Sequence, residues 1–335
     1  MTPTEVYDTY WYFAAERQAM YERRLCDPVG PWTTDPILKA HRFTNTYRAA
    51  DRVSQYLIRE VQYRSDRPQA PAEVFFRTML FKLFNKVETW ELLERQLGTI
   101  SWQSFDAAEA CKVLDSAYAA SVRIYSAAYI MPAPALGHAR KHANHLTLLN
   151  NMMQDNLAAR VRKAPTLRAV YELIRQYPGI GPFLAFQYAI DLNYSELLSF
   201  DENDFVVAGP GALDGIAKCF KDAETMAPAE VIQHMVDVQD REFERLELDF
   251  GGLFGRRLHL IDCQNLFCEV SKYARVAHPG VRGVNDRKRI KQNYQSSGRG
   301  PGTPMFPPRW RLNPPTVPPH LASVAPWAGE QAFLL

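Results

Sequence analysis

Apolar residues recur at three- and four-residue spacing through most of the chain, which is the periodicity of amphipathic α-helices. This pattern predicts helices over residues 7–24, 41–63, 72–83, 89–97, 107–125, 139–158 and 167–176. Alternating strand patterns joined by Asn-Gly or Asp-Gly turns are missing from the sequence. The chain is therefore expected to be all-α.

The composition changes after residue 280. Residues 301–326 contain nine prolines, a composition that builds no core of its own. Trp310 and Trp327 nevertheless offer rings that can pack onto a folded body, and a loosely ordered tail is the alternative. We expect a helical body of two lobes around a cleft over residues 1–280, followed by a basic and then proline-rich tail over residues 281–335.

Charge and cysteine content narrow the cellular setting. The net charge of +2 says little, but residues 272–311 hold ten Lys or Arg and a single acid, Asp286. Five scattered cysteines do not suggest a disulfide framework. No apolar run approaches the roughly 18 residues that a membrane span needs. These features predict a soluble cytoplasmic protein with no membrane partner.

Residues 173–192 form the most informative segment, a helical stretch, the turn Pro178-Gly179-Ile180-Gly181 and a second helical stretch that begins with Pro182. Two glycines separated by one residue allow a tight turn whose amide groups point outward at the start of the second helix. Such a turn binds an anion without a basic side chain. We expect Gly179, Ile180 and Gly181 to bind a DNA phosphate, with the Ile180 side chain packed inward.

A second DNA contact is expected in the basic stretch that contains Arg287, Lys288 and Arg289. Lysine and arginine side chains that neutralise phosphates supply most of the sequence-independent affinity for DNA. A solvated charge run is the alternative.

The hairpin resembles that of the helix-hairpin-helix DNA glycosylase superfamily. Asp201 follows Gly179 by 22 residues, which is the spacing of the catalytic aspartate in that superfamily. The resemblance implies that Asp201, Glu202 or Asp204 is catalytic, and capping of a helix by Asp201 or Asp204 is the alternative. The lysine that forms a Schiff base in bifunctional members is replaced by Phe183, so lysine-dependent lyase chemistry is not expected.

Residues 76–85, 202–216 and 262–275 resemble the α-glutamyl/putrescinyl-thymine pyrophosphorylase family and its related antiviral DNA glycosylases. The resemblance implies a helix-hairpin-helix, glycosylase-like fold. It favours a monofunctional DNA glycosylase, a hydrolase that flips and excises a hypermodified pyrimidine, such as glucosylated 5-hydroxymethylcytosine, from double-stranded phage DNA in antiviral defence. The alternatives are a transferase that replaces pyrophosphate on 5-pyrophosphomethyl-uracil with an amine, and a non-catalytic reader of modified DNA.

The same segments contain residues suited to a base pocket. Their glycines allow close approach of the backbone to a ligand, and their polar side chains can contact a base edge. The predicted pocket residues are Arg77, Asn85, Gly209, Gly211, Asn265, Glu269, Lys272 and Tyr273. The alternatives are a close contact between helices at the glycines, a solvated ion-paired face around Glu269 and Lys272, and partnered polar groups at Arg77 and Asn85.

No cofactor or metal ion is expected. His138, His142 and His145 fall on one face of a helix, but no acid or cysteine follows at convincing ligand spacing. The sequence also lacks a Gly-x-x-x-x-Gly-Lys-Ser/Thr loop. The pyrophosphorylating step of thymine hypermodification is therefore assigned to another protein.

Overall fold

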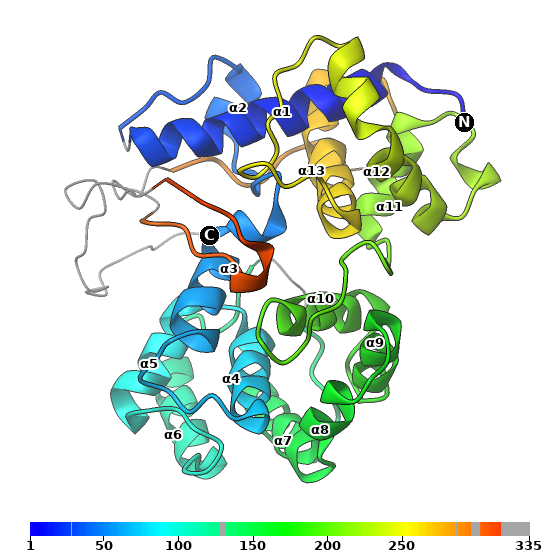
Figure 1. The fold of residues 1–335 in the computed structure, drawn as a ribbon. Coiled ribbons are helices and arrows are strands. Elements are labelled where there is room, and N and C mark those ends of the chain that lie inside the picture. The colour runs from blue at the N-terminus through cyan, green and yellow to red at the C-terminus, as the bar shows by residue number, and fades with distance from the viewer. Residues whose placement is uncertain (28, 128–130, 286, 296–301, 316–335) are drawn as a thin grey trace. The chain divides into compact units, whose positions relative to one another are not determined.

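The computed structural model describes residues 1–315 except residues 28, 128–130, 286 and 296–301. Every regular element in this part of the chain is a helix (Figure 1), and β-pairing is limited to three isolated bridges. The all-α prediction is confirmed. No helix among the described residues is both long and apolar enough to cross a membrane.

The chain forms two compact units. Unit 1 combines residues 1–52 with the described residues from Phe205 onward, and unit 2 comprises residues 53–204. The helices of unit 1 are α1 (Glu5–Cys26), α2 (Pro36–Ala40), η1 (Arg48–Ala50), α11 (Pro210–Cys219), η3 (Ala223–Thr225), α12 (Pro228–Arg245), α13 (Leu260–Ala277) and η4 (Pro308–Trp310).

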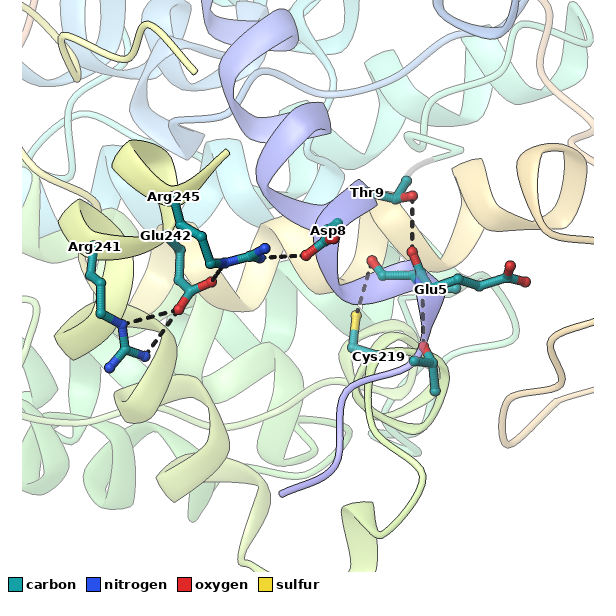
Figure 2. Close-up of polar contacts among 9 residues, drawn as sticks. Glu5, Asp8, Thr9, Cys219, Arg241, Glu242 and Arg245 are labelled. Carbon is teal, nitrogen blue, oxygen red and sulfur yellow. Dashed lines mark hydrogen bonds and ion pairs between the residues drawn. The ribbon is translucent and has the colours of Figure 1, made fainter. Parts of the chain in front are cut away.

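Helix α13 is central to unit 1, where it contacts α1, α2, α11 and α12. Figure 2 shows how the neighbouring helices α1 and α12 are joined at the surface. Arg245 donates to Asp8 of α1 and, at 2.8 Å, to Glu242 of its own helix. Because Arg245 is exposed, these ion pairs orient the helices more than they stabilise them, contributing up to about 1 kcal/mol each.

The tail returns to unit 1 at residues 302–312. The ring of Phe306 lies 6.0 Å from that of Phe254, and the guanidinium of Arg256 lies 3.8 Å from the centre of the Trp310 ring. A cation placed over an indole face is attracted by its quadrupole. Trp310 thus contacts the body through Arg256, whereas Trp327 lies outside the described residues.

Unit 2 is built around one helix that is buried on all sides. Its helices are α3 (Arg52–Tyr56), which starts at the boundary, η2 (Leu57–Gln62), α4 (Pro71–Phe84), α5 (Val87–Leu97), α6 (Ala107–Ala119), α7 (Lys141–Gln154), α8 (Leu157–Arg162), α9 (Leu167–Arg175) and α10 (Pro182–Asn193). Residues 73–84 of α4 are all buried, as expected of a largely apolar helix in a core, and the charged residues among them have polar partners. It contacts α5, α7, α8 and α10.

The predicted helix over residues 41–63 is wrong in its first half. Residues 41–47 run without helix because tertiary partners hold their polar groups: Thr46 donates to the Ala14 carbonyl, and Glu269 accepts from the Thr44 amide at 3.0 Å. The predicted helix over 107–125 ends early, at Ala119. Ser121 there adopts a left-handed φ of 59° and the Val122 amide donates to the Ala117 carbonyl, a Schellman-type stop.

Candidate nucleic-acid interface

The hairpin between α9 and α10 exposes a glycine turn at the start of a helix. Thr166 caps α9, and Gly179 has a φ of +80°, which explains the glycine at this position. Ile180 is 7% exposed and packs inward, as predicted, whereas Gly179 and Gly181 are exposed. The first turn of any helix leaves amide groups without an intrahelical acceptor. This end of α10 therefore has the geometry of an anion site.

The three acids predicted to be catalytic follow the other end of α10. Asn193, the last residue of the helix, accepts from the Phe200 amide and donates to its carbonyl, both at 3.0 Å. This clamp fixes the segment that leads to Asp201, Glu202 and Asp204. The 12 residues of α10 separate the hairpin from the clamp by about 18 Å at the α-helical rise.

None of these acids caps a helix, because the next helix, α11, begins at Pro210 after Gly209. Asp201 and Asp204 are exposed, and Asp201 accepts from the Asn203 amide at 2.9 Å in a local turn. Glu202 is 3% exposed. The structure therefore argues against the capping alternative.

The basic segment of unit 1 is an extended strap over residues 287–291, here called the basic strap. Arg287, Lys288, Arg289 and Lys291 are exposed. Asp214 anchors the preceding residues by accepting from the Asn285 amide at 2.9 Å. Burial opposes ionisation of Asp214, yet hydrogen bonds from Ser271, Asn285 and Lys218 hold its pKa below the usual value. The cations are thus displayed on a fixed backbone.

The predicted stripe on α13 faces the non-helical segment that precedes η1. Asn265 donates to Thr44 and to the Asn45 carbonyl. Lys272 pairs with Glu269 at 2.7 Å, and Tyr273 is buried and donates to Asp35 at 2.6 Å. The ion-paired alternative therefore describes Glu269 and Lys272, and all four side chains have partners within unit 1.

Asp51, which the sequence analysis missed, lies close to this stripe. Burial raises its pKa to about 7, against the opposing effect of the Asn45 amide, which donates to it at 2.7 Å. Glu269 raises the pKa further, whereas Arg17 and Arg48 lower it. A carboxyl group that titrates near neutrality is a candidate acid or base. The sequence pattern gives no reason to single out Asp51, because it predicts one continuous helix over residues 41–63.

Arg77 and Asn85 are enclosed in unit 2. The guanidinium of Arg77, fully buried, donates to the carbonyls of Val61 at 3.0 Å and Pro68 at 2.7 Å. Asn85 ends α4 with a left-handed φ of 49° and accepts from Lys82, which also pairs with buried Asp191 at 3.1 Å. Asn85 and two of the three guanidinium nitrogens of Arg77 thus have the protein partners that a buried polar group requires, whereas Nη2 of Arg77 has no hydrogen-bond partner among the described residues.

The glycines of α11 serve helix packing. A Cβ atom on Gly215 would lie 2.1 Å from the Phe267 carbonyl oxygen of α13, and one on Gly211 would lie 3.0 Å from the Cys268 sulfur. Gly209 is buried and precedes the first turn of α11. The close-contact alternative accounts for Gly211 and Gly215.

A cavity of about 300 Å³ lies in unit 2 between α4, α6 and α7, at the lower end of the range of small-ligand sites. Phe76, Trp102 and Phe105 supply its aromatic wall, and Asn150 adds an amide. None of the predicted base-pocket residues lines it. Trp102 and Phe105, in the loop before α6, are the residues from which this cavity could have been predicted from the sequence.

The three histidines of the α7 region do not converge. His138 precedes the helix and contacts Thr147 at 3.0 Å, and His145 donates to the Pro132 carbonyl and accepts from Tyr125. Burial lowers the pKa of His145 to about 4. His142 faces Asp115 of α6, with 2.9 Å between Nε2 and Oδ1.

Comparison with known proteins places the chain among DNA-modifying proteins. A family model described as "5-hmdU DNA kinase, helical domain" matches residues 4–283. A 5-hmdU DNA kinase of Bacillus phage SP10 is 27% identical over 293 residues, covering 81% of this chain and 45% of that protein. The chain thus spans less than half the length of this relative. No solved structure matches the chain.

These findings overturn the predicted reaction. The relative is named a kinase, which transfers a phosphoryl group, so the predicted glycosylase and hydrolase activity is wrong. Neither the amine transferase nor the non-catalytic reader is supported by the comparisons. The coarser expectation of a DNA-modifying family with a phage association is confirmed. Because the family model matches most of its length, the chain belongs to the 5-hmdU DNA kinase helical-domain family.

Proposed function

We propose that the chain binds the DNA substrate of a kinase reaction. In this reaction the hydroxymethyl group of 5-hydroxymethyl-2′-deoxyuridine (5-hmdU) in DNA is phosphorylated. The family match over residues 4–283, which reaches into both units, carries this proposal. The triphosphate site belongs to another domain or protein, consistent with the lack of a Walker-type loop in these 335 residues.

The hairpin and the basic strap hold the DNA backbone in this proposal. Gly179 and Gly181 expose the start of α10, where outward amides and the helix dipole favour a phosphate. The exposed cations of the strap supply counter-charge from unit 1. These contacts position the strand without selecting a sequence, and the modified base is recognised separately.

Phosphoryl transfer to a hydroxyl also requires a group that accepts the hydroxyl proton. Asp201 is exposed and lies on a segment clamped to α10 by Asn193, so we assign it this role. Glu202 and Asp204 help to shape the same turn. Asp51 of unit 1 is the second candidate because its raised pKa suits a base at neutral pH.

The test uses duplexes of one sequence that contain either 5-hmdU or thymidine. The chain is expected to bind the 5-hmdU duplex more tightly, by about tenfold if one hydrogen bond to the hydroxyl is made. A chimera, in which the chain replaces the matching part of the phage relative, is expected to add phosphate to 5-hmdU, detected by mass spectrometry of the nucleosides.

Asp201→Asn and Asp51→Asn chimeras separate the two candidate bases. The catalytic aspartate is the one whose loss abolishes transfer while DNA binding persists. Equal affinity for both duplexes, together with an inactive but folded chimera, contradicts the proposed function.

A further inference from the structure

Three potential metal ligands meet on the surface of unit 2, and none of them belongs to the hairpin or to the three acids. Cys111 and Asp115 lie on α6, and His142 lies on α7. Their ligand atoms all lie within 4.8 Å of one another. The Asp115 carboxylate is 2.9 Å from Nε2 of His142 and 3.7 Å from the Cys111 sulfur.

The two helices hold these side chains in place. Cys111 and Asp115 are four residues apart, so they share one face of α6. The start of α6 is fixed by Asp106, which accepts from the Ala108 and Glu109 amides. His142 is 2% exposed, so its ring is held by packing with only its Nε2 edge toward the acid.

We propose that Cys111, Asp115 and His142 bind a divalent transition-metal ion, with Zn²⁺ as the preferred ion and water completing a tetrahedron. Thiolate, imidazole and carboxylate are the ligand types that zinc takes. Bond lengths of 2.0–2.3 Å imply separations of about 3.4 Å between tetrahedral ligands. Nε2 of His142 lies 2.9 Å from Oδ1 of Asp115, the Cys111 sulfur lies 3.7 Å from Oδ2, and the three ligand atoms lie within 4.8 Å of one another, so side-chain rotations can bring them to one ion.

The charge balance of the cluster also suits a divalent ion. On binding, the S–H bond of Cys111 breaks, a sulfur–zinc bond forms and the proton passes to solvent, with no change in oxidation state. The thiolate and Asp115 then carry two negative charges against Zn²⁺, and neutral His142 donates its lone pair. The cations next to the ligands in sequence have other contacts: Lys112 pairs with Glu109 at 2.6 Å, and Arg140 and Lys141 lie over the rings of Tyr118 and Tyr125.

A His142–Asp115 pair without metal explains the 2.9 Å contact alone. It leaves the Cys111 thiol, whose sulfur lies 3.7 Å from the same carboxylate, as a third potential ligand beside the pair. The metal site accounts for all three groups. Since no fourth His, Cys, Asp or Glu of the described residues joins the cluster, the ion clamps α6 to α7 and keeps one position for water.

Cobalt(II) chloride serves as the probe, added to the full chain after dialysis against a chelator. We expect one Co²⁺ per chain, a thiolate-to-cobalt charge-transfer band in the near ultraviolet, displacement by Zn²⁺, and a higher melting temperature with Zn²⁺. Cys111→Ser is expected to remove the band. Asp115→Asn should weaken binding more than about 100-fold, since even outer-shell losses cost about 10- to 100-fold.

Both substitutions change residues that are not buried, so the variants should fold. Cys26→Ser, which changes an exposed thiol, and Glu109→Gln, on the same helix, are the matched controls and should bind cobalt as the parent does. Absence of the charge-transfer band in the parent, or its persistence in Cys111→Ser, overturns the proposal. Unchanged affinity in Asp115→Asn also overturns the ligand set.

Discussion

Replacing Gly181 with aspartate is expected to stabilise the fold while it weakens DNA binding. Gly181 is the N-cap of α10, has extended backbone angles of φ −77° and ψ 172°, and contributes no side-chain hydrogen bond to the helix. A Cβ atom here would have no heavy atom within 4 Å. An aspartate therefore fits without strain, and its carboxylate can accept from the first-turn amides.

The two effects can be estimated separately. Aspartate in place of an N-cap glycine adds a few tenths of a kcal/mol from capping and about 0.3–1 kcal/mol from the helix dipole, so the free energy of unfolding should rise by about 0.5–1 kcal/mol. A phosphate at the same amides would lie about 5 Å from the new carboxylate. Repulsion at that distance is roughly 1–3 kcal/mol for effective dielectric constants between water and a protein surface, which weakens binding about 5- to 150-fold.

Urea unfolding gives the first quantity, and fluorescence anisotropy with a labelled duplex at several salt concentrations gives the second. Gly181→Asn is the matched control, because it caps the helix without adding charge and should retain most of the affinity. If Gly181→Asp binds DNA as tightly as the parent at low salt, no phosphate lies at this helix end and the reasoning is refuted.

Three further predictions concern packing, charge and pH. Gly215→Ala should lower the free energy of unfolding by about 3 kcal/mol or more, because its Cβ would meet the Phe267 carbonyl at 2.1 Å. Gly98→Ala, at a φ of 76° and a ψ of −150° but in open space, should cost about 1–3 kcal/mol in the same urea assay. Replacing residues 287–289 with alanine should reduce the slope of log affinity against log salt concentration by about 2 to 3. An unchanged slope would show that the basic strap does not contact DNA phosphates. Because the pKa of Asp51 is raised to about 7 from an ordinary value near 3.8, the folded state binds the extra proton and stability should fall as pH rises between these values, by up to about 4 kcal/mol. Asp51→Asn should flatten that part of the pH profile of urea unfolding, and an unaltered profile rules out the shift.

Local sequence signals predicted the hairpin well, because the turn needs glycine at a positive φ and proline suits the first turn of α10. The segment before η1 was mispredicted because tertiary hydrogen bonds to Glu269 and Ala14 override its helical periodicity. The cluster of Cys111, Asp115 and His142 joins two helices separated by a long connection, so spacing along the chain does not indicate it.

The reaction was the least predictable property. A hairpin that binds phosphate and a nearby acid suit both excision of a base and phosphorylation of its substituent, since both require a held strand and a placed carboxylate. Residue spacing alone does not distinguish a sugar carbon from a hydroxymethyl oxygen as the reacting atom. The family match points to a kinase for the relative, and phosphorylation with the help of this chain is the function proposed above.

Helix α10 connects the glycine turn of the hairpin rigidly to the clamp at Asn193. In the proposed function this helix sets the distance between the bound phosphate and the acids. About 18 Å of helix corresponds to roughly five nucleotides along one strand of B-form DNA. The phosphate held at Gly181 then belongs to a nucleotide several steps from the modified base. A 5-hmdU placed at the end of a duplex, where that distant phosphate is missing on one side, should be a poorer substrate than the same base in the interior.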